Sequence, residues 1–316
     1  MQSSAPSSIE SPPLVIGTRG SPLALAQASQ VRDRLAAAHA LTAERIELEV
    51  IRTTGDAIRD RPLAEAGGKG LFTKEIEEAL IAGAIDLAVH SAKDMPTILP
   101  SGLAIAAVLP REDARDVFIS RKAKTLADLP HGATVGTTSP RRQALVKRLR
   151  SDLLVVPLRG NVETRLRKLA AGDVDAILLA LAGLKRLGLA EAATAVLPVD
   201  EFLPAVGQGI IAIEARGNDE RALPLVAAVN HADTAAALTA ERAYLAVLEG
   251  SCRTPIAGHA TVARGWLTFR GLIAKPDGSD VFETERHGAV VDAVRLGAEA
   301  GRELKQRAGA DFFAAV

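Results

Sequence analysis

The pentapeptide HSAKD, residues 90–94, has four polar residues and directly follows a predicted strand, residues 85–89. A lysine can hold an anionic group, and a carboxylate can stabilise a cation or carry a proton. Because ligands bind beyond the carboxyl ends of strands in open α/β sheets, Lys93 and Asp94 are candidate site residues. Pro96 disfavours a helix at Met95, so we expect this turn to stay extended. Judged by spacing alone, a salt-bridged loop is the simpler explanation of these charges.

Two other segments combine arginine with the start of a helix. Ser21 and Ser139 lie where an N-cap belongs, and each is followed by a proline at the first helical position. A helix N-terminus binds anions through its free N–H groups and its dipole. Arginine at both turns favours anion binding over ordinary capping. The arginines concerned are Arg19 before the first helix and Arg141 and Arg142 within the second.

A third turn of this kind is LRGN, residues 158–161. Gly160 lets the backbone bend, and Asn161 can cap the helix that follows. Arg159 then lies at the start of this helix and Arg165 one turn into it. Because all these arginines follow predicted strands, we expect them to converge on one cleft between domains. Such a cleft suits a ligand with many carboxylates better than one with a single phosphate.

The run GGKG, residues 67–70, precedes another predicted helix. It is not a P-loop, because Lys69 is followed by Gly70 and the upstream glycine is missing. A mobile lid and a plain surface loop explain this run equally well.

The single cysteine, Cys252, lies in a predicted loop after a helix that ends near Leu248. Arg253 beside it favours the thiolate, which is the nucleophilic form. Covalent attachment of a group and an ordinary loop cysteine remain equally good explanations. A hydrolase with a cysteine nucleophile would need a histidine partner, and nothing in the sequence fixes the position of His259 relative to the thiol.

Short apolar runs alternate with helical patterns along the chain, which predicts α/β domains with largely parallel sheets. The predicted strand cores are 15–16, 48–50, 86–89, 104–108, 117–119, 134–135, 153–156, 176–179, 210–213 and 266–269. The predicted helices are 22–38, 73–82, 140–150, 162–171, 235–248 and 289–307.

Two pairs of segments resemble each other. IGTRGSPLAL (16–25) matches VGTTSPRRQAL (135–145), and AGAIDLAVHSAKD (82–94) matches AGDVDAILLALAGLKR (171–186). We infer two domains of similar topology, and we expect Asp86 and its counterpart Asp175 to serve the starts of strands. The predicted division is a first domain of residues 13–110 and 205–228, a second of 111–204, a small α+β third of 229–316 and a disordered tail of 1–12.

Composition excludes several classes of protein. Lys and Arg total 38 and Asp and Glu total 38, so no basic excess indicates nucleic acid or anionic membrane as a partner. One cysteine allows no intramolecular disulfide, which fits the cytoplasm. We expect no membrane span, because no run of about 18 apolar residues occurs. The six histidines are scattered, so we expect no metal site.

The chain after residue 13 resembles the porphobilinogen deaminase (hydroxymethylbilane synthase) family. HSAKD, LRGNVETRL and LEGSC are together highly specific for it. The blocks that agree in order include TRGSPLALAQ (18–27), GGKGLFTKEIE (67–77), DLAVHSAKDMP (86–96), REDARDVF (111–118), GTTSPRRQ (136–143), LRGNVETRLRKL (158–169), LPAVGQG (203–209) and LEGSCRTPIAG (248–258).

This resemblance implies three domains, of which two are doubly wound and similar to the halves of periplasmic binding proteins. It implies a transferase of haem and tetrapyrrole biosynthesis that joins four porphobilinogens, with loss of ammonia, into hydroxymethylbilane. It implies a dipyrromethane cofactor in thioether linkage to Cys252, Asp94 as the catalytic group, and a monomer. The implied binders of cofactor and substrate are Arg19, Ser21, Lys93, Ser139, Arg141, Arg142, Arg159, Arg165 and Arg186, with Lys69 and Phe72 on a lid.

Three departures from the family pattern are small: Ala92 for methionine, Pro140 for leucine and Ser251 for glycine. None removes a reactive group. A solute-binding protein or the effector domain of a regulator would share the two-lobed fold, but neither would explain a tethering cysteine or HSAKD.

Overall fold

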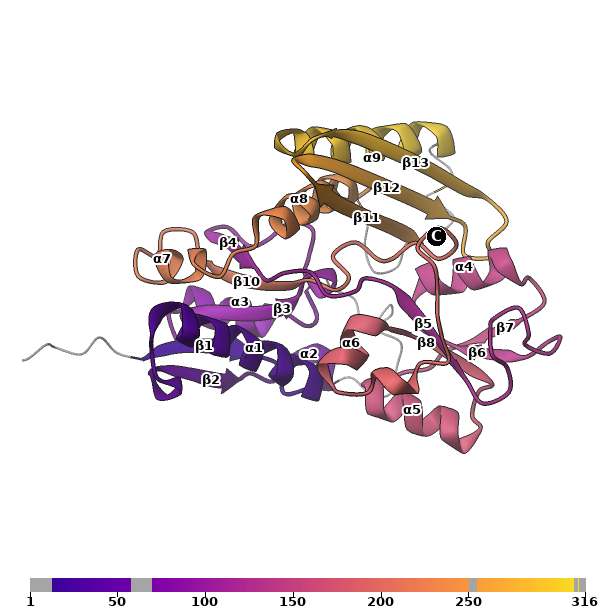
Figure 1. The fold of residues 1–316 in the computed structure, drawn as a ribbon, viewed down its shortest axis with the longest axis horizontal. Coiled ribbons are helices and arrows are strands. Elements are labelled where there is room, and N and C mark those ends of the chain that lie inside the picture. The colour runs from indigo at the N-terminus through magenta and orange to yellow at the C-terminus, as the bar shows by residue number, and fades with distance from the viewer. Residues whose placement is uncertain (1–12, 58–69, 250–254, 310–311, 313–316) are drawn as a thin grey trace, which may run out of the picture.

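The computed structural model describes residues 13–57, 70–249, 255–309 and 312. Its strands form three sheets. In Figure 1 two five-stranded sheets lie side by side, and a three-stranded sheet lies above them. Within the described residues, none of the helices combines the length and the apolar character that a bilayer span requires.

The first sheet has the strand order β2-β1-β3-β10-β4. β1 runs parallel to β2 and β3, whereas β10 runs antiparallel to β3 and β4. Its strands are β1 (Leu14–Thr18), β2 (Ile46–Val50), β3 (Leu87–Ser91), β4 (Leu103–Val108) and β10 (Ile211–Arg216). The helices of this part are α1 (Pro22–His39), α2 (Thr54–Ala57), α3 (Lys74–Ile81) and α7 (Ala222–Ala227).

The second sheet has the order β7-β6-β8-β5-β9 and repeats the first sheet's pattern of directions. β6 runs parallel to β7 and β8, and β5 runs antiparallel to β8 and β9. Its strands are β5 (Asp116–Ser120), β6 (Thr134–Gly136), β7 (Leu154–Val156), β8 (Ala176–Ala180) and β9 (Ala195–Val196). The helices are α4 (Pro140–Leu149), α5 (Val162–Ala171) and α6 (Leu181–Arg186).

The matching strand orders explain why two pairs of segments resemble each other in sequence. The first pair supplies β1 with α1 and β6 with α4, and the second supplies β3 and β8. The expectation of largely parallel sheets is confirmed for the two five-stranded sheets, because four strands of each run in one direction and a single strand, β10 or β5, runs against them. β5 and β10 are the strands by which the chain enters one sheet from the other. They therefore lack the helical crossover within one sheet that parallel pairing needs.

Asp86 and Asp175 directly precede the equivalent strands β3 and β8, and each binds the start of a neighbouring strand. Asp86 Oδ2 accepts a hydrogen bond from the amide of Val15 at 2.9 Å, and Asp175 Oδ2 accepts one from the amide of Thr134 at 2.7 Å. Each carboxylate thus fixes the first residues of a neighbouring strand. The predicted role of both at strand starts is confirmed.

The third sheet is antiparallel and consists of β11 (Ile256–Ala263), β12 (Trp266–Ala274) and β13 (Val281–Ala289). It packs with α8 (Ala232–Val247) and α9 (Ala293–Ala308), and Tyr244 of α8 lies 4.9 Å from Phe269 between ring centroids. The last helix begins later than predicted because Ala289 still pairs with Trp266 in the sheet. The predicted fold class, α/β with a small α+β part at the C-terminal end, is confirmed.

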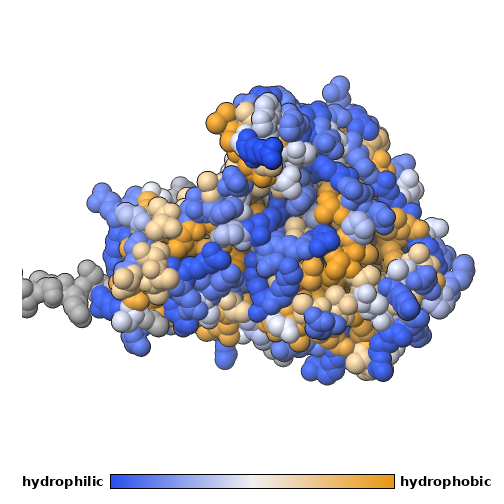
Figure 2. Space-filling view, in the orientation of Figure 1, coloured by the Kyte–Doolittle hydropathy of each residue, from blue (hydrophilic) through white to orange (hydrophobic). Residues whose placement is uncertain are grey.

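Hydrophilic side chains gather in the middle of the face shown in Figure 2, where the three parts of the molecule adjoin. The core around Leu145 and Phe118 of the second part continues into the third part at Ala257 and Leu272, whereas Ile16 and Leu87 lie in a core of the first. The junction between the parts is thus polar on the face shown and apolar where the second and third parts share a core.

Candidate functional site

A hollow of about 380 Å³ opens where α1 begins and β3 ends. β1 leads into α1, and β3 lies beside β1 in the sheet, so the carboxyl ends of two parallel strands meet here. This is where ligands bind in open α/β sheets. The polar residues at this hollow include Arg19, Ser21, Thr73, His90, Ser91 and Asp94.

The start of α1 has the predicted cap. Ser21 Oγ accepts a hydrogen bond from the amide of Ala24 at 3.2 Å, and Pro22 occupies the first helical position. The Arg19 guanidinium lies over the ring of Phe72, with 4.1 Å between its central carbon and the ring centroid. A capped helix start beside a guanidinium presents positive charge to the hollow.

HSAKD is less loop-like than predicted. His90 and Ser91 belong to β3 and pair with Ala212 and Ile211 of β10. Ala92–Asp94 form a single 3-10 turn, and Met95 after this turn is extended, as Pro96 requires. Pairing with the antiparallel strand β10 extends β3 two residues beyond its predicted end at Val89. Sequence reasoning did not predict this pairing, which sets the position of the turn that contains Asp94.

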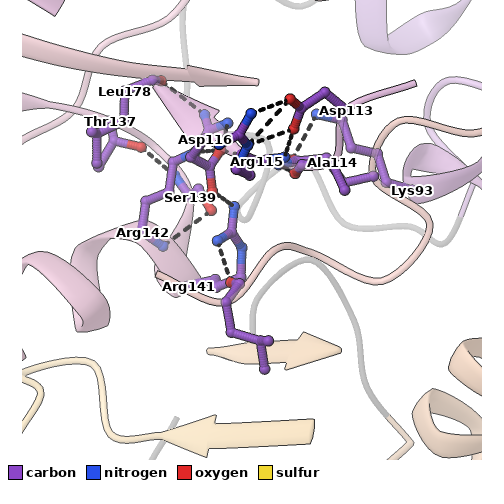
Figure 3. Close-up of polar contacts among 12 residues, drawn as sticks. Lys93, Asp113, Ala114, Arg115, Asp116, Thr137, Ser139, Arg141, Arg142 and Leu178 are labelled. Atoms are coloured by element: carbon purple, nitrogen blue, oxygen red, sulfur yellow. Dashed lines mark hydrogen bonds and ion pairs between the residues drawn. The ribbon is translucent and has the colours of Figure 1, made fainter. Parts of the chain in front are cut away.

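The start of α4 also has its predicted cap, since Ser139 Oγ accepts a hydrogen bond from the amide of Arg142 at 3.4 Å. The arginines of this helix, however, bind a carboxylate of the protein (Figure 3). Arg141 Nη2 lies 2.7 Å from Asp116 Oδ2, and Arg142 Nη2 lies 2.6 Å from Asp116 Oδ1. All three side chains are buried, and contact of these arginines with cofactor or substrate stays a prediction.

Asp116 stays ionised in the interior because of these neighbours. Burial alone would raise the pKa of its carboxyl, but the charges of Arg141 and Arg142 outweigh burial and hold the pKa at about 2. Main-chain carbonyls satisfy further guanidinium N–H groups: Arg141 Nη1 donates to Leu203 O at 2.8 Å and Arg142 Nη1 to Leu178 O at 2.9 Å. These contacts connect β5, the first strand of the second part, to α4 and β8.

Gln208 joins this ion cluster to the HSAKD turn. Its Nε2 donates to Ala114 O at 2.6 Å and to Asp116 Oδ1 at 3.2 Å, while its Oε1 accepts from Lys93 Nζ at 3.5 Å. Gly207 has a φ of 71°, and a Cβ there would lie 2.9 Å from the Lys93 amide nitrogen. Glycine is needed for this close approach.

Lys93 carries a pKa lowered to about 8. Crowding by protein atoms is the main cause, and the charges of Arg142 and Arg141 add to it, whereas Asp94 and Asp116 oppose it. Its side chain nevertheless remains accessible to solvent. A lysine of this kind can hold an anion at neutral pH and lose its charge in mild alkali.

The third turn is formed as predicted. Gly160 has a φ of 123°, and Asn161 Oδ1 accepts a hydrogen bond from the amide of Thr164 at 2.9 Å. Arg165 Nε donates to Gly160 O at 2.8 Å. Burial, with help from Arg142, lowers the pKa of Arg165 to about 10, while the charge of Asp94 opposes the shift. Arg165 of the second part therefore shares an electrostatic environment with Asp94 of the first.

The structure brings some of the predicted residues together and not others. Arg19, Ser21, Lys93 and Arg165 lie at the hollow or in electrostatic contact with Asp94, as the predicted convergence requires. Arg186, by contrast, donates from Nη2 to Gly209 O at 2.7 Å, in the loop that holds Gln208. Lys69 and Cys252 lie outside the described residues, so the lid and the attachment point stay predictions.

Asp116 and Gln208 are the site residues that sequence reasoning missed. Both stand in segments that the family resemblance includes, REDARDVF and LPAVGQG. A usable signal was an aspartate at the head of the otherwise apolar strand 116–119, because a buried carboxylate demands cationic partners. A second signal was the glycine on each side of Gln208, since glycines permit the tight turns that bring a side chain close to another segment.

The arrangement fits a ligand that carries several carboxylates. Cationic side chains and a capped helix start surround one acid, Asp94. The N–H groups of these side chains and of the helix start can donate hydrogen bonds to the carboxylates of a ligand. Such donors suit a dipyrromethane, whose pyrrole rings bear carboxylate side chains. In the part of the chain that the structure describes, no three His, Cys, Asp or Glu side chains are grouped as metal ligands would be.

Comparison with known proteins gives the same picture. A family model described as "Porphobilinogen deaminase, dipyromethane cofactor binding domain" matches residues 14–224, and the model of the C-terminal domain of that family matches 235–306. A porphobilinogen deaminase of Nitrobacter winogradskyi is 63% identical over 94% of both chains. A chloroplastic porphobilinogen deaminase of Oryza sativa subsp. japonica is 56% identical over 94% of this chain and 85% of its own.

Solved structures with a similar arrangement include a putative methionine-binding lipoprotein from Bacillus subtilis. It is 16% identical, with a TM-score of 0.42, and the match covers 69% of this chain and 90% of the lipoprotein.

Two family models and relatives of high identity along almost the whole chain lead to one conclusion. The chain belongs to the porphobilinogen deaminase family, transferases of tetrapyrrole biosynthesis that build hydroxymethylbilane from porphobilinogen on a dipyrromethane cofactor.

Proposed function

We propose that Asp94 is the catalytic group with which this chain condenses four porphobilinogens into hydroxymethylbilane. When the substrate loses ammonia, it leaves a methylene-pyrrole cation whose charge needs a nearby carboxylate. The Asp94 carboxylate lies at the hollow where two parallel strands end. It can stabilise that cation and relay a proton. The position of Asp94 in this hollow is the observation that carries the proposal.

The basic residues around Asp94 would hold and orient carboxylates. We assign this role to Arg19, Ser21, Lys93 and Arg165 at the hollow or near Asp94, and also to Ser139, Arg159 and Arg186 of the second part. Arg141 and Arg142 would act from the Asp116 cluster, where second N–H groups of the same nitrogens can still donate.

We further propose that Cys252 carries the dipyrromethane through a thioether. The assignment is supported by the resemblance of LEGSC to the family and by the presence of a single cysteine in the chain. When bound, the dipyrromethane supplies the pyrrole carbon to which the first substrate is joined. Residues of the hollow would bind its carboxylates.

The division into residues 13–110 with 205–228, 111–204 and 229–316 is likewise a proposal. It is supported by the grouping of the strands into three sheets. We also propose that the chain works as a cytoplasmic monomer without metal, membrane or nucleic acid. A neutral formal charge and a lone cysteine support this assignment.

Replacement of Asp94 by asparagine tests the catalytic role. We expect Asp94→Asn to carry the cofactor but to turn over porphobilinogen about 10²- to 10⁴-fold more slowly, because it can neither balance the cation nor carry a proton. Asp173→Asn, an exposed aspartate before β8, is the matched control and should keep wild-type turnover. Wild-type turnover in cofactor-loaded Asp94→Asn would refute the assignment.

A further inference from the structure

A group of ionisable side chains lies beneath the hollow and takes no part in the proposed chemistry. Glu214 of β10 is fully buried, and its Oε2 lies 3.2 Å from Nε2 of His90, which is itself 3% exposed. Glu77 of α3 is 6% exposed. These three residues, here called the buried acid cluster, join α3, β3 and β10.

The cluster cannot carry two uncompensated negative charges. Neither oxygen of Glu214 accepts a hydrogen bond from any described residue, nor does Oε1 of Glu77. Removing a carboxylate from water costs several kcal/mol unless a partner balances it. His90, once protonated, balances one carboxylate at 3.2 Å and leaves the other without a counter-ion.

The two carboxyl groups of the cluster have different neighbours. Glu214 has His90 at ion-pair distance, and it also feels Arg242 of α8, whose Nη2 donates to the carbonyls of Pro96 and Thr97. Glu77 faces Thr73, Glu214 and His90. Burial raises the pKa of Glu77 first of all, Thr73 and His90 oppose this, and the charge of Glu214 adds to it.

We propose that Glu77 carries a proton in the buried acid cluster, beside the His90–Glu214 pair, and that this state positions Asp94. A protonated Glu77 can donate a hydrogen bond, which an ionised one cannot. Thr73 and His90 both lie at the hollow, and Asp94 follows His90 by four residues. Ionisation of Glu77 would place its negative charge near Glu214, beneath the HSAKD turn. The repulsion between the two carboxylates would push α3 away from β10.

Glu77 and His90 are thus positioning residues, and the link to turnover rests on the role proposed for Asp94. The protonation state itself does not depend on that role. It can therefore be measured separately, and failure of one claim is distinguishable from failure of the other.

Infrared spectroscopy of the purified holoenzyme at neutral pH tests the protonation state directly. We expect a carbonyl-stretch band of a protonated carboxyl group, absent from Glu77→Gln and present in Glu78→Gln. Glu78 is the adjacent, exposed residue of the same helix and serves as the matched control. If the wild-type holoenzyme shows no such band, or if Glu77→Gln retains it, the proposal is wrong.

The pH dependence of stability supplies the second readout. A carboxyl whose folded pKa is raised stabilises the fold fully below its unfolded value, 4.5, and loses that contribution as pH rises through the folded value. The Tm of Glu77→Gln minus that of wild type should therefore grow as pH rises above about 4.5. For Glu78→Gln the difference should stay flat, and equal slopes for the two variants would overturn the proposal.

Turnover then tests positioning. Because glutamine mimics the neutral acid, the kcat of Glu77→Gln should hold to higher pH than that of wild type. Glu214→Gln, which removes the partner of His90, should lose turnover at all pH values. If the kcat of Glu77→Gln falls at the same alkaline pH as that of wild type, the cluster does not affect catalysis, whatever the infrared result.

Discussion

At the scale of single residues, the protein places unlike charges where each alters the others. Lys93 and Asp94 are adjacent in the chain, and the residues around them include both the Asp116 cluster and Arg165. As a result, Lys93 loses its proton more easily than an ordinary lysine. Its neighbour Asp94 is the acid proposed to stabilise a cation. Sequence alone identified Lys93, Asp94 and the two arginines of α4, but not Asp116, which binds those arginines and also affects the pKa of Lys93.

The lowered pKa of Lys93 leads to a prediction about pH. Its charge is present below about pH 8 and lost as pH rises through that value. If the charged form holds a carboxylate, kcat/KM for porphobilinogen should fall through this range. Lys93→Arg, which stays charged, should keep its activity to higher pH, as a pH series of kcat/KM would show. A wild-type profile that is flat from pH 7 to about pH 9 would contradict the role of the Lys93 charge.

At the scale of elements, one carboxylate organises the second sheet. Asp116 is the first residue of β5, and it binds two successive arginines of α4 and the side chain of Gln208 in the loop before β10. This single group therefore connects a strand, a helix and the chain's return to the first sheet.

Removal of the Asp116 charge should be costly. Asp116→Asn leaves two buried guanidinium groups without a counter-ion, and we expect a loss of about 3–5 kcal/mol in the free energy of unfolding, measured by denaturant titration. Asp113→Asn provides the comparison, because its partner Arg115 is 44% exposed and such pairs contribute at most about 1 kcal/mol. Equal losses in the two variants would mean that Asp116 does not have this structural role.

Most elements could be predicted from apolar runs and caps, because those signals are local. Ser21, Ser139 and Asn161 cap the predicted helices, and Asp86 and Asp175 serve the predicted strand starts. What could not be predicted depends on residues far apart in the chain. The antiparallel placement of β10, the extension of β3 to Ser91 and the partnership of Arg141 with Asp116 all require contacts between distant segments.

At the scale of the whole molecule, both five-stranded sheets position residues that affect Asp94 or Lys93, and the predicted attachment point belongs to the predicted third domain. The hollow lies in the first part, while Arg165 and the Asp116 cluster belong to the second. Because the topology is repeated, helix starts of both parts, α1 in the first and α4 and α5 in the second, contribute basic residues around Asp94. A ligand with many carboxylates can contact basic residues of both parts.

The central claim is that a dipyrromethane bound to Cys252 lies among these basic residues. Intact mass spectrometry of the purified protein tests it most directly. We predict a mass greater than that of the polypeptide by one dipyrromethane, and an unmodified mass with no turnover for Cys252→Ser. A wild-type protein that has the mass of the bare polypeptide and still converts porphobilinogen at full rate would contradict the account.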